Sequence, residues 1–126
     1  MGKNVGVEAF VDALASVEAA AAEVRAALAA LDDANAAVRR ALDDGIANHE
    51  LLSSTGWADH RAAVISALGA YSSELKRARA EYVRVLVDGD GFTISDAARV
   101  IGHPRQLTKR IYDTSRDGLD GGTFTV

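Results

Sequence analysis

The side chains of this sequence that are best suited to binding a partner lie close to its C-terminus. The stretch 105–113 reads R-Q-L-T-K-R-I-Y-D. If it is helical, Leu107 and Ile111 are four residues apart and pack inward. The outer face then carries basic, amide and acidic groups: Arg105, Gln106, Lys109, Arg110 and Asp113. Guanidinium and ammonium groups pair with phosphates, so this chemistry suits a polyanionic partner.

The residues before this stretch predict a second short helix and a turn that positions the basic one. Ser95 is the expected N-cap of a helix over 96–101. Gly102 can adopt the left-handed conformation that a tight turn requires. Pro104 fits the first turn of the next helix, because it lacks only an N–H that would be unpaired there. We therefore expect two short amphipathic helices joined by a glycine turn over residues 94–112.

This segment resembles the helix-turn-helix superfamily of bacterial DNA-binding proteins, found in repressors and in the tails of resolvase-type recombinases. Ala98 and Gly102 match the small-residue and turn-glycine positions of the superfamily. Further matches are the apolar positions and the opening of the second helix: Ala97, Ile101, Ile111, Arg105 and Gln106. Two residues depart from the pattern. His103 replaces an apolar residue, and Thr108 replaces an inward aliphatic one, which would rotate the second helix slightly.

The resemblance implies roles for the individual side chains. Arg105 and Gln106, early on the second helix, would contact base edges, since Arg suits guanine O6 and N7 and Gln suits adenine N6 and N7. Phosphate contacts that supply most of the affinity would come from Lys109, Arg110 and Arg116. Ser95, in the first turn of its helix, would also donate to a phosphate. The alternative is an ordinary solvated face on a structural hairpin.

The charge distribution favours a local rather than a general nucleic-acid footprint. The net charge of the 126-residue chain is −4, yet residues 93–116 carry five basic and two acidic side chains. Residues 1–52 carry four basic and nine acidic ones, and residues 53–92 are balanced. Cations matter only on the face that meets phosphates, so an acidic arm and a basic head are compatible with binding DNA.

The N-terminal half predicts a long helix with a heptad repeat. Apolar residues recur at steps of three and four from Val7 to Leu42, and only Asn35 interrupts them at an a position. Alanine occupies most g positions, which favours close packing in a bundle. The residues expected to mediate dimerisation are taken from this seam: Phe10, Leu14, Val17, Leu28 and Asn35. An a-position Asn can fix register, or it can face water at a bend.

A second heptad seam begins at Trp57 and runs through Val64, Leu68 and Leu75. Between the two seams lies a short break with Ser53, Ser54 or Thr55 as possible N-caps. The second helix must then fold back antiparallel on the first. The first helix is expected to be the longer by roughly 12 residues on this count of helical positions. Its N-terminal turns, residues 7–17, would then overhang and pair with a second copy, or would fray.

Four segments follow from these patterns. Residues 1–88 form a helical hairpin that resembles a coiled coil, 89–92 a glycine hinge, 93–116 the helix-turn-helix, and 117–126 a glycine-rich tail. The similar stretches 91–94 and 123–126 could pair as a minimal β-ribbon wing, or the tail could be disordered. The predicted fold class is all-α.

Composition argues against several other classes of protein. The chain has no cysteine, and its three histidines are not in metal-ligand spacings. No phosphate-cradling motif is present, and the paired carboxylates are expected on helix surfaces. We therefore expect no enzymatic activity, no metal and no cofactor. No apolar run approaches the roughly 20 residues of a membrane span, which predicts a cytoplasmic, nucleoid-associated protein without a membrane partner.

Together these features predict a small dimeric transcriptional regulator, of repressor type, that binds double-stranded DNA in a sequence-specific way. A different class stays open on the same sequence. The alanine-rich helices could form an interaction or assembly module that binds a partner protein without binding DNA.

Overall fold

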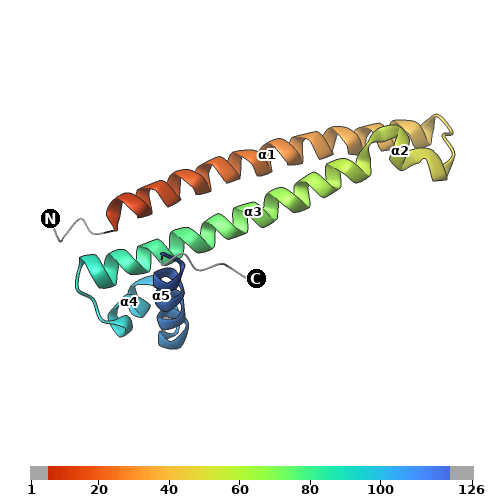
Figure 1. Cartoon of the computed structure of the whole chain (residues 1–126). Coiled ribbons are helices and arrows are strands. Elements are labelled where there is room, and N and C mark those ends of the chain that lie inside the picture. Colours follow the sequence, from red (N-terminus) through yellow and green to blue (C-terminus); the bar gives the residue numbers. More distant parts are fainter. Residues whose placement is uncertain (1–5, 120–126) are drawn as a thin grey trace. The chain divides into compact units, whose positions relative to one another are not determined.

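The computed structural model describes residues 6–119, with side chains described to residue 115. All regular elements in this part of the chain are helices (Figure 1), which confirms the predicted all-α class. The elements in chain order are α1 (Val7–Asp43), the 3-10 turn η2 (Asn48–Glu50), α2 (Leu51–Thr55), α3 (Trp57–Arg84), the π-helical turn η3 (Val85–Gly89), α4 (Ile94–Ile101) and α5 (Arg105–Leu119).

The chain divides into two compact units, and α1 and α3 each contribute to both. Unit 1 combines the residues up to Ser16 with those from Glu74 onward, and unit 2 is Val17–Ser73. The boundaries of these units differ from those of the four segments that the sequence patterns predict. The segments stay a prediction: 1–88, 89–92, 93–116 and 117–126. Unit 2 contains the link between the two long helices, and unit 1 contains α4 and α5.

In unit 2 the second part of α1 and the first part of α3 lie side by side and antiparallel (Figure 1). Trp57 Nε1 donates a hydrogen bond of 2.7 Å to Asn35 Oδ1. This bond satisfies both partly buried polar groups, which would otherwise be costly away from water. Asn35 therefore has a polar partner within the chain.

The contact between α1 and α3 in unit 2 matches the predicted seams only in part. Ala34 and Val64 are buried, whereas Leu28 is 44% and Leu68 47% exposed. The contact passes through the small residues one position earlier, such as Ala27, because short side chains let two helix backbones approach closely. The leucines are left at the edge, so Leu28 and Leu68 are wrong as seam residues of this helix pair, whereas Val64 of the same predicted seam is buried.

The link between α1 and α3 is longer than the sequence suggested. Helix α1 ends at Asp43, and η2 and α2 intervene before α3 begins at Trp57. Thr55 Oγ1 accepts a hydrogen bond of 3.4 Å from the Trp57 N–H, in keeping with its expected capping role. The hydroxyls of Ser53 and Ser54 instead donate to carbonyls three residues earlier in the chain.

In unit 1 the N-terminal turns of α1 pack against the end of α3. The rings of Phe10 and Tyr82 have centroids 5.2 Å apart. Ala13 and Val83 have no exposed surface, and a Cβ added to Gly6 would lie 3.5 Å from Val85 Cγ2. The predicted overhang of residues 7–17 is therefore wrong. Helix α1 ends at Asp43, and the chain stays helical beyond α3 through η3. The end of α3 therefore lies alongside the first turns of α1.

Helix α4 begins earlier than predicted. Its N-cap is Thr93, whose side chain accepts a hydrogen bond of 3.0 Å from the N–H of Asp96. Ser95 lies inside the first turn of the helix, so the prediction of Ser95 as N-cap is wrong. Phe92 and Thr93 are not in a strand, and the second stretch of the proposed β-ribbon, 123–126, lies outside the described residues.

Candidate nucleic-acid interface

The turn between α4 and α5 depends on Gly102, as its spacing predicted. Gly102 has φ 74°, and its N–H and that of His103 donate to the carbonyl of Ala98 at 2.9 and 3.1 Å. These bonds satisfy a carbonyl at the end of α4 and reverse the chain direction. A Cβ at Gly102 would meet nothing within 4 Å, so the requirement for glycine there is conformational rather than steric.

The two short helices contact each other through small and β-branched side chains. Ala97 and Ala98 of α4 are buried, as expected, and Thr108 and Ile111 of α5 are buried with them. The Thr108 hydroxyl donates to the carbonyl of Pro104 at 3.0 Å, so its polar group is satisfied without water. Leu107, predicted to point inward, is only half-buried. Thr108 takes the inward position because the local bond removes its polarity from the contact.

The predicted outward side chains of α5 are all exposed: Arg105, Gln106, Lys109, Arg110 and Asp113. Lys109 Nζ forms an ion pair of 2.8 Å with Asp113 Oδ2, four residues later. Among the described residues, Gln106 and Arg110 have no side-chain hydrogen bond or ion pair. The Arg116 side chain lies outside the described ones. The exposed face of α5 thus presents two arginines, a lysine shared with Asp113, and an amide.

Ser95 and Arg105 lie together, although the sequence assigned them to different helices without a contact. Arg105 Nε donates to Ser95 Oγ at 3.1 Å. This bond links the two sides of the turn and uses only Nε of the guanidinium. The two terminal amino groups take no part in it and retain four N–H donors. Arg99, also on α4, pairs with Asp96 in its own helix.

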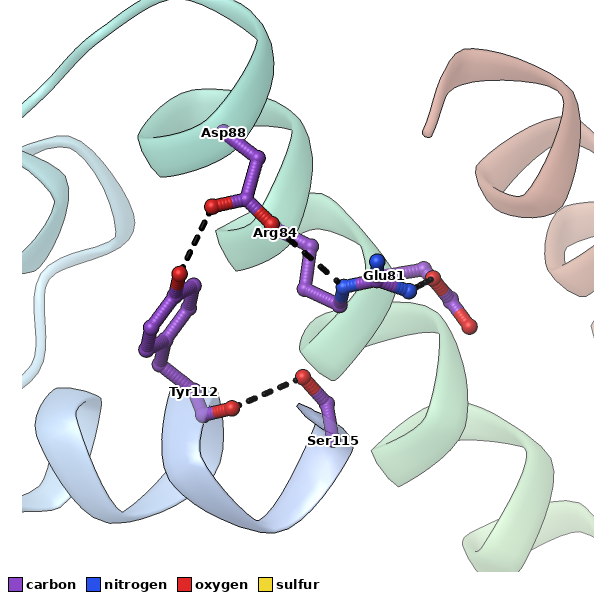
Figure 2. Close-up of polar contacts among 5 residues, drawn as sticks. All are labelled: Glu81, Arg84, Asp88, Tyr112 and Ser115. Carbon is purple, nitrogen blue, oxygen red and sulfur yellow. Dashed lines mark hydrogen bonds and ion pairs between the residues drawn. The ribbon is translucent and has the colours of Figure 1, made fainter. Parts of the chain in front are cut away.

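A polar chain connects α5 to the end of α3 within unit 1 (Figure 2). The Tyr112 hydroxyl donates to Asp88 Oδ1 at 2.6 Å, and Asp88 Oδ2 lies 3.7 Å from Arg84 Nε. Arg84 Nη1 donates in turn to Glu81 Oε1 at 3.4 Å. Within α5, the Ser115 hydroxyl donates to the Tyr112 carbonyl at 2.9 Å. Of these bonds, the one from Tyr112 to Asp88 joins α5 to η3 and favours one rotation of α5.

Sequence reasoning missed this chain of bonds. No partner was predicted for Tyr112, and Asp88 was placed at the end of the segment 1–88, next to the glycine hinge. The two residues are 24 positions apart, and no periodicity links them. A tyrosine beside a core position, with a hydroxyl that requires a partner when partly buried, is the only signal that could have suggested a distant acceptor.

The residues predicted to mediate dimerisation have different environments. Phe10 and Val17 are half-buried within their own units, and Asn35 accepts the hydrogen bond from Trp57. Leu14 in unit 1 and Leu28 in unit 2 are exposed. Only these two of the five present large apolar surface to solvent.

Other kinds of site are not found in the described part of the chain. It contains no group of three or more His, Asp or Glu side chains close enough to hold a metal ion. Nor does any of its helices combine the length and the apolar character needed to cross a membrane. Comparison with models of protein families, with curated proteins and with solved structures gave no match to this chain.

Proposed function

We propose that this protein binds double-stranded DNA in a sequence-specific way and acts as a small dimeric regulator of transcription, of repressor type. In this proposal α4 and α5 form a helix-turn-helix, with α5 as the recognition helix. The long helices α1 and α3 form an antiparallel hairpin, similar to a coiled coil, that supports dimerisation. The observation that most favours the proposal is the exposed basic and amide face of α5 directly after a tight glycine turn.

The proposed base contacts depend on the N-terminal turn of α5. In a helix-turn-helix this part of the second helix enters the major groove. Arg105 and Gln106 are exposed there, and the Ser95 bond holds the Arg105 side chain along the turn. An arginine with a restricted side chain loses less conformational entropy when it forms a bidentate bond to guanine.

The proposed phosphate contacts come from the following turn of α5. Arg110 has no acidic partner among the described residues, whereas Lys109 is paired with Asp113. An exposed ion pair of this kind is weak, so Lys109 can exchange Asp113 for a phosphate at little cost. Arg116 is placed by sequence on the same helix and completes the proposed set. Each phosphate contact releases counterions and makes binding sensitive to salt.

The proposal is tested by titrating the full chain against a pool of random duplexes of roughly 30 base pairs, about three helical turns of DNA. The titration is repeated at two salt concentrations. We expect the Arg105→Ala/Arg110→Ala double variant to lose about 2–6 kcal/mol of binding free energy, on a scale of 1–3 per base or charged contact. Selection from the pool should enrich a roughly palindromic sequence for the wild type.

The matched control is Lys76→Ala/Arg77→Ala, which removes the same charge from exposed positions of α3. It should bind duplexes like the wild type, because only cations that face phosphates contribute. Absence of binding by the wild type even at low salt, where nonspecific attraction is strongest, would contradict the proposal.

A second candidate function is a helical interaction module that binds a partner protein without DNA. It is favoured by the exposed leucines Leu28 and Leu68 on unit 2. Under this alternative the Arg105→Ala/Arg110→Ala variant keeps its full activity, and a charge introduced at Leu28 abolishes partner binding.

A further inference from the structure

We infer that unit 2 pairs with a second copy of itself in antiparallel orientation, through one face of α1 centred on Leu28. This face, called the dyad face below, consists of residues three and four apart on α1: Glu18, Ala21, Arg25, Leu28, Asp32, Asn35 and Arg39. The inference rests on the dimeric part of the proposed function and assigns its surface. It does not depend on DNA binding.

The charged residues of the dyad face alternate in sign at heptad spacing. Glu18, Arg25, Asp32 and Arg39 follow one another at intervals of seven residues and are all exposed. Within the described part of the chain none of the four takes part in an ion pair. Charges seven residues apart on a straight helix are about 10 Å from each other, too far for direct pairing. Their alternation therefore produces no ion pair within α1 itself.

The alternation is self-complementary when two copies of α1 run antiparallel about a two-fold axis near Leu28. Glu18 then faces Arg39 of the second copy, and Arg25 faces Asp32. Because the interface is isologous, each of these pairs occurs twice, which gives four opposite-charge pairs. Leu28 packs against its own symmetry mate at the centre.

Other alignments of the same face bring like charges together. A parallel pairing in register places Glu18 opposite Glu18 and Arg25 opposite Arg25. An antiparallel pairing shifted by one heptad, with the axis at Arg25, places Glu18 opposite Asp32 and Arg25 opposite itself. Such juxtapositions are unfavourable, so the charges select one register and one direction.

The centre of the face is apolar, as a stable interface requires. Leu28 is 44% exposed and follows the seam residue Ala27, and Leu68 is 47% exposed and follows Ala67 of α3. Two antiparallel helices are related by an approximate two-fold axis perpendicular to their plane. Leu28 and Leu68 each follow a contact alanine by one position, so they are equivalent positions and lie on the same face of the pair. Leu68 therefore extends the apolar surface of Leu28. A second copy buries this surface along with the charged border.

A charge-exchange experiment on the full chain tests the inference by sedimentation equilibrium. Arg25→Glu converts two attractive pairs into two repulsive ones, and we expect the dimer dissociation constant to rise at least about tenfold. Arg25→Glu/Asp32→Arg restores opposite charges, and we expect a dissociation constant within about threefold of the wild type. The matched control is Arg40→Glu, an exposed arginine on another face of α1, which should leave the dimer intact.

The direction and register are tested by cross-linking, since the chain has no cysteine of its own. Leu28→Cys should form a disulfide-linked dimer on mild oxidation, because the axis brings its Cβ close to that of its mate, near the roughly 4 Å that a disulfide needs. Asp32→Cys lies on the same face but about 10 Å from its own mate at 1.5 Å per residue, so it should not cross-link.

Three results would overturn the inference. One is a wild-type protein that stays monomeric at the highest concentration measured. Another is a dimer that the Arg25→Glu and Leu28→Glu variants leave unchanged. The third is cross-linking of Asp32→Cys in preference to Leu28→Cys. Failure of the wild type to bind any duplex, combined with rescue of the dimer by the charge exchange, would reject the DNA proposal and leave the dyad face established.

Discussion

At the scale of single residues, two polar side chains contribute to how α5 packs in unit 1. Thr108 forms its hydrogen bond to the carbonyl of Pro104, the residue before α5, so a polar residue can occupy a fully buried position of that helix. Tyr112 reaches out of the helix to Asp88 on η3. A rotation of α5 would break the bond to Asp88 and would bring different side chains to the face that carries Arg105 and Arg110.

Tyr112→Phe tests the bond between Tyr112 and Asp88. The variant keeps the ring and removes the hydroxyl, and we expect it to lower the free energy of unfolding by about 1 kcal/mol, since Asp88 is exposed and water partly replaces the lost donor. Urea denaturation measures the change. The control is Tyr71→Phe, a half-buried tyrosine of unit 2. Equal effects of the two variants would show that the Asp88 bond contributes nothing specific.

At the scale of elements, the backbone conformation shows which glycines a turn requires and which could be replaced by another residue. Gly102 has φ 74° at the C-terminus of α4, and Gly69 lies inside α3, where a Cβ would meet no atom within 4 Å. Neither glycine would suffer a steric clash with an added methyl group. The two sites differ only in the backbone conformation that they impose.

Gly102→Ala and Gly69→Ala should therefore have opposite effects on stability. We expect Gly102→Ala to lower the free energy of unfolding by about 1–2 kcal/mol, the cost of the left-handed conformation for an L-residue. Gly69→Ala should raise it by about 0.5–1 kcal/mol, because alanine loses less backbone entropy in a helix. Thermal and urea denaturation of both variants provide the measurement. A stabilised Gly102→Ala protein would contradict the role assigned to the turn.

At the scale of the whole molecule, the proposed dimer and the proposed DNA contacts are linked. A dimer presents two copies of α5, and binding of the second to the same duplex is then intramolecular. Two-fold symmetry also predicts half-sites about 34 Å apart, or a multiple of that distance. Loss of the dimer should therefore weaken binding even though no residue of α5 is changed.

Leu28→Glu tests this linkage, since it alters unit 2 alone. We expect its affinity for the selected palindrome to fall at least about tenfold, toward that of a single half-site. Its affinity for a duplex with one half-site should match the wild type, which is the internal control. Duplex titrations with the two DNA probes measure both values. An undiminished affinity for the palindrome would show that the two proposals are independent.

The sequence by itself determined the all-helical class, the turn at Gly102, the inward alanines of α4 and the exposed face of α5. These features are local, since helix periodicity and the special conformation of glycine act over a few residues. The sequence predicted Leu107 as the inward residue of α5, whereas the buried residue is Thr108, one position later. A hydrogen bond to Pro104 satisfies the Thr108 hydroxyl, and composition alone cannot reveal that bond.

Only the tertiary structure decided which face of each long helix meets the other and which residues end up adjacent across the chain. A heptad pattern with apolar a, d and g positions allows two seams, and the close approach permitted by alanine selects the one through Ala34 rather than Leu28. The tertiary structure also decided where α1 ends, at Asp43, and how long the segment before α3 is. As a result, residues 7–17 do not form the overhang that the sequence predicted. The bonds Asn35–Trp57 and Asp88–Tyr112 join residues far apart in sequence, and such contacts follow from packing rather than from any local pattern.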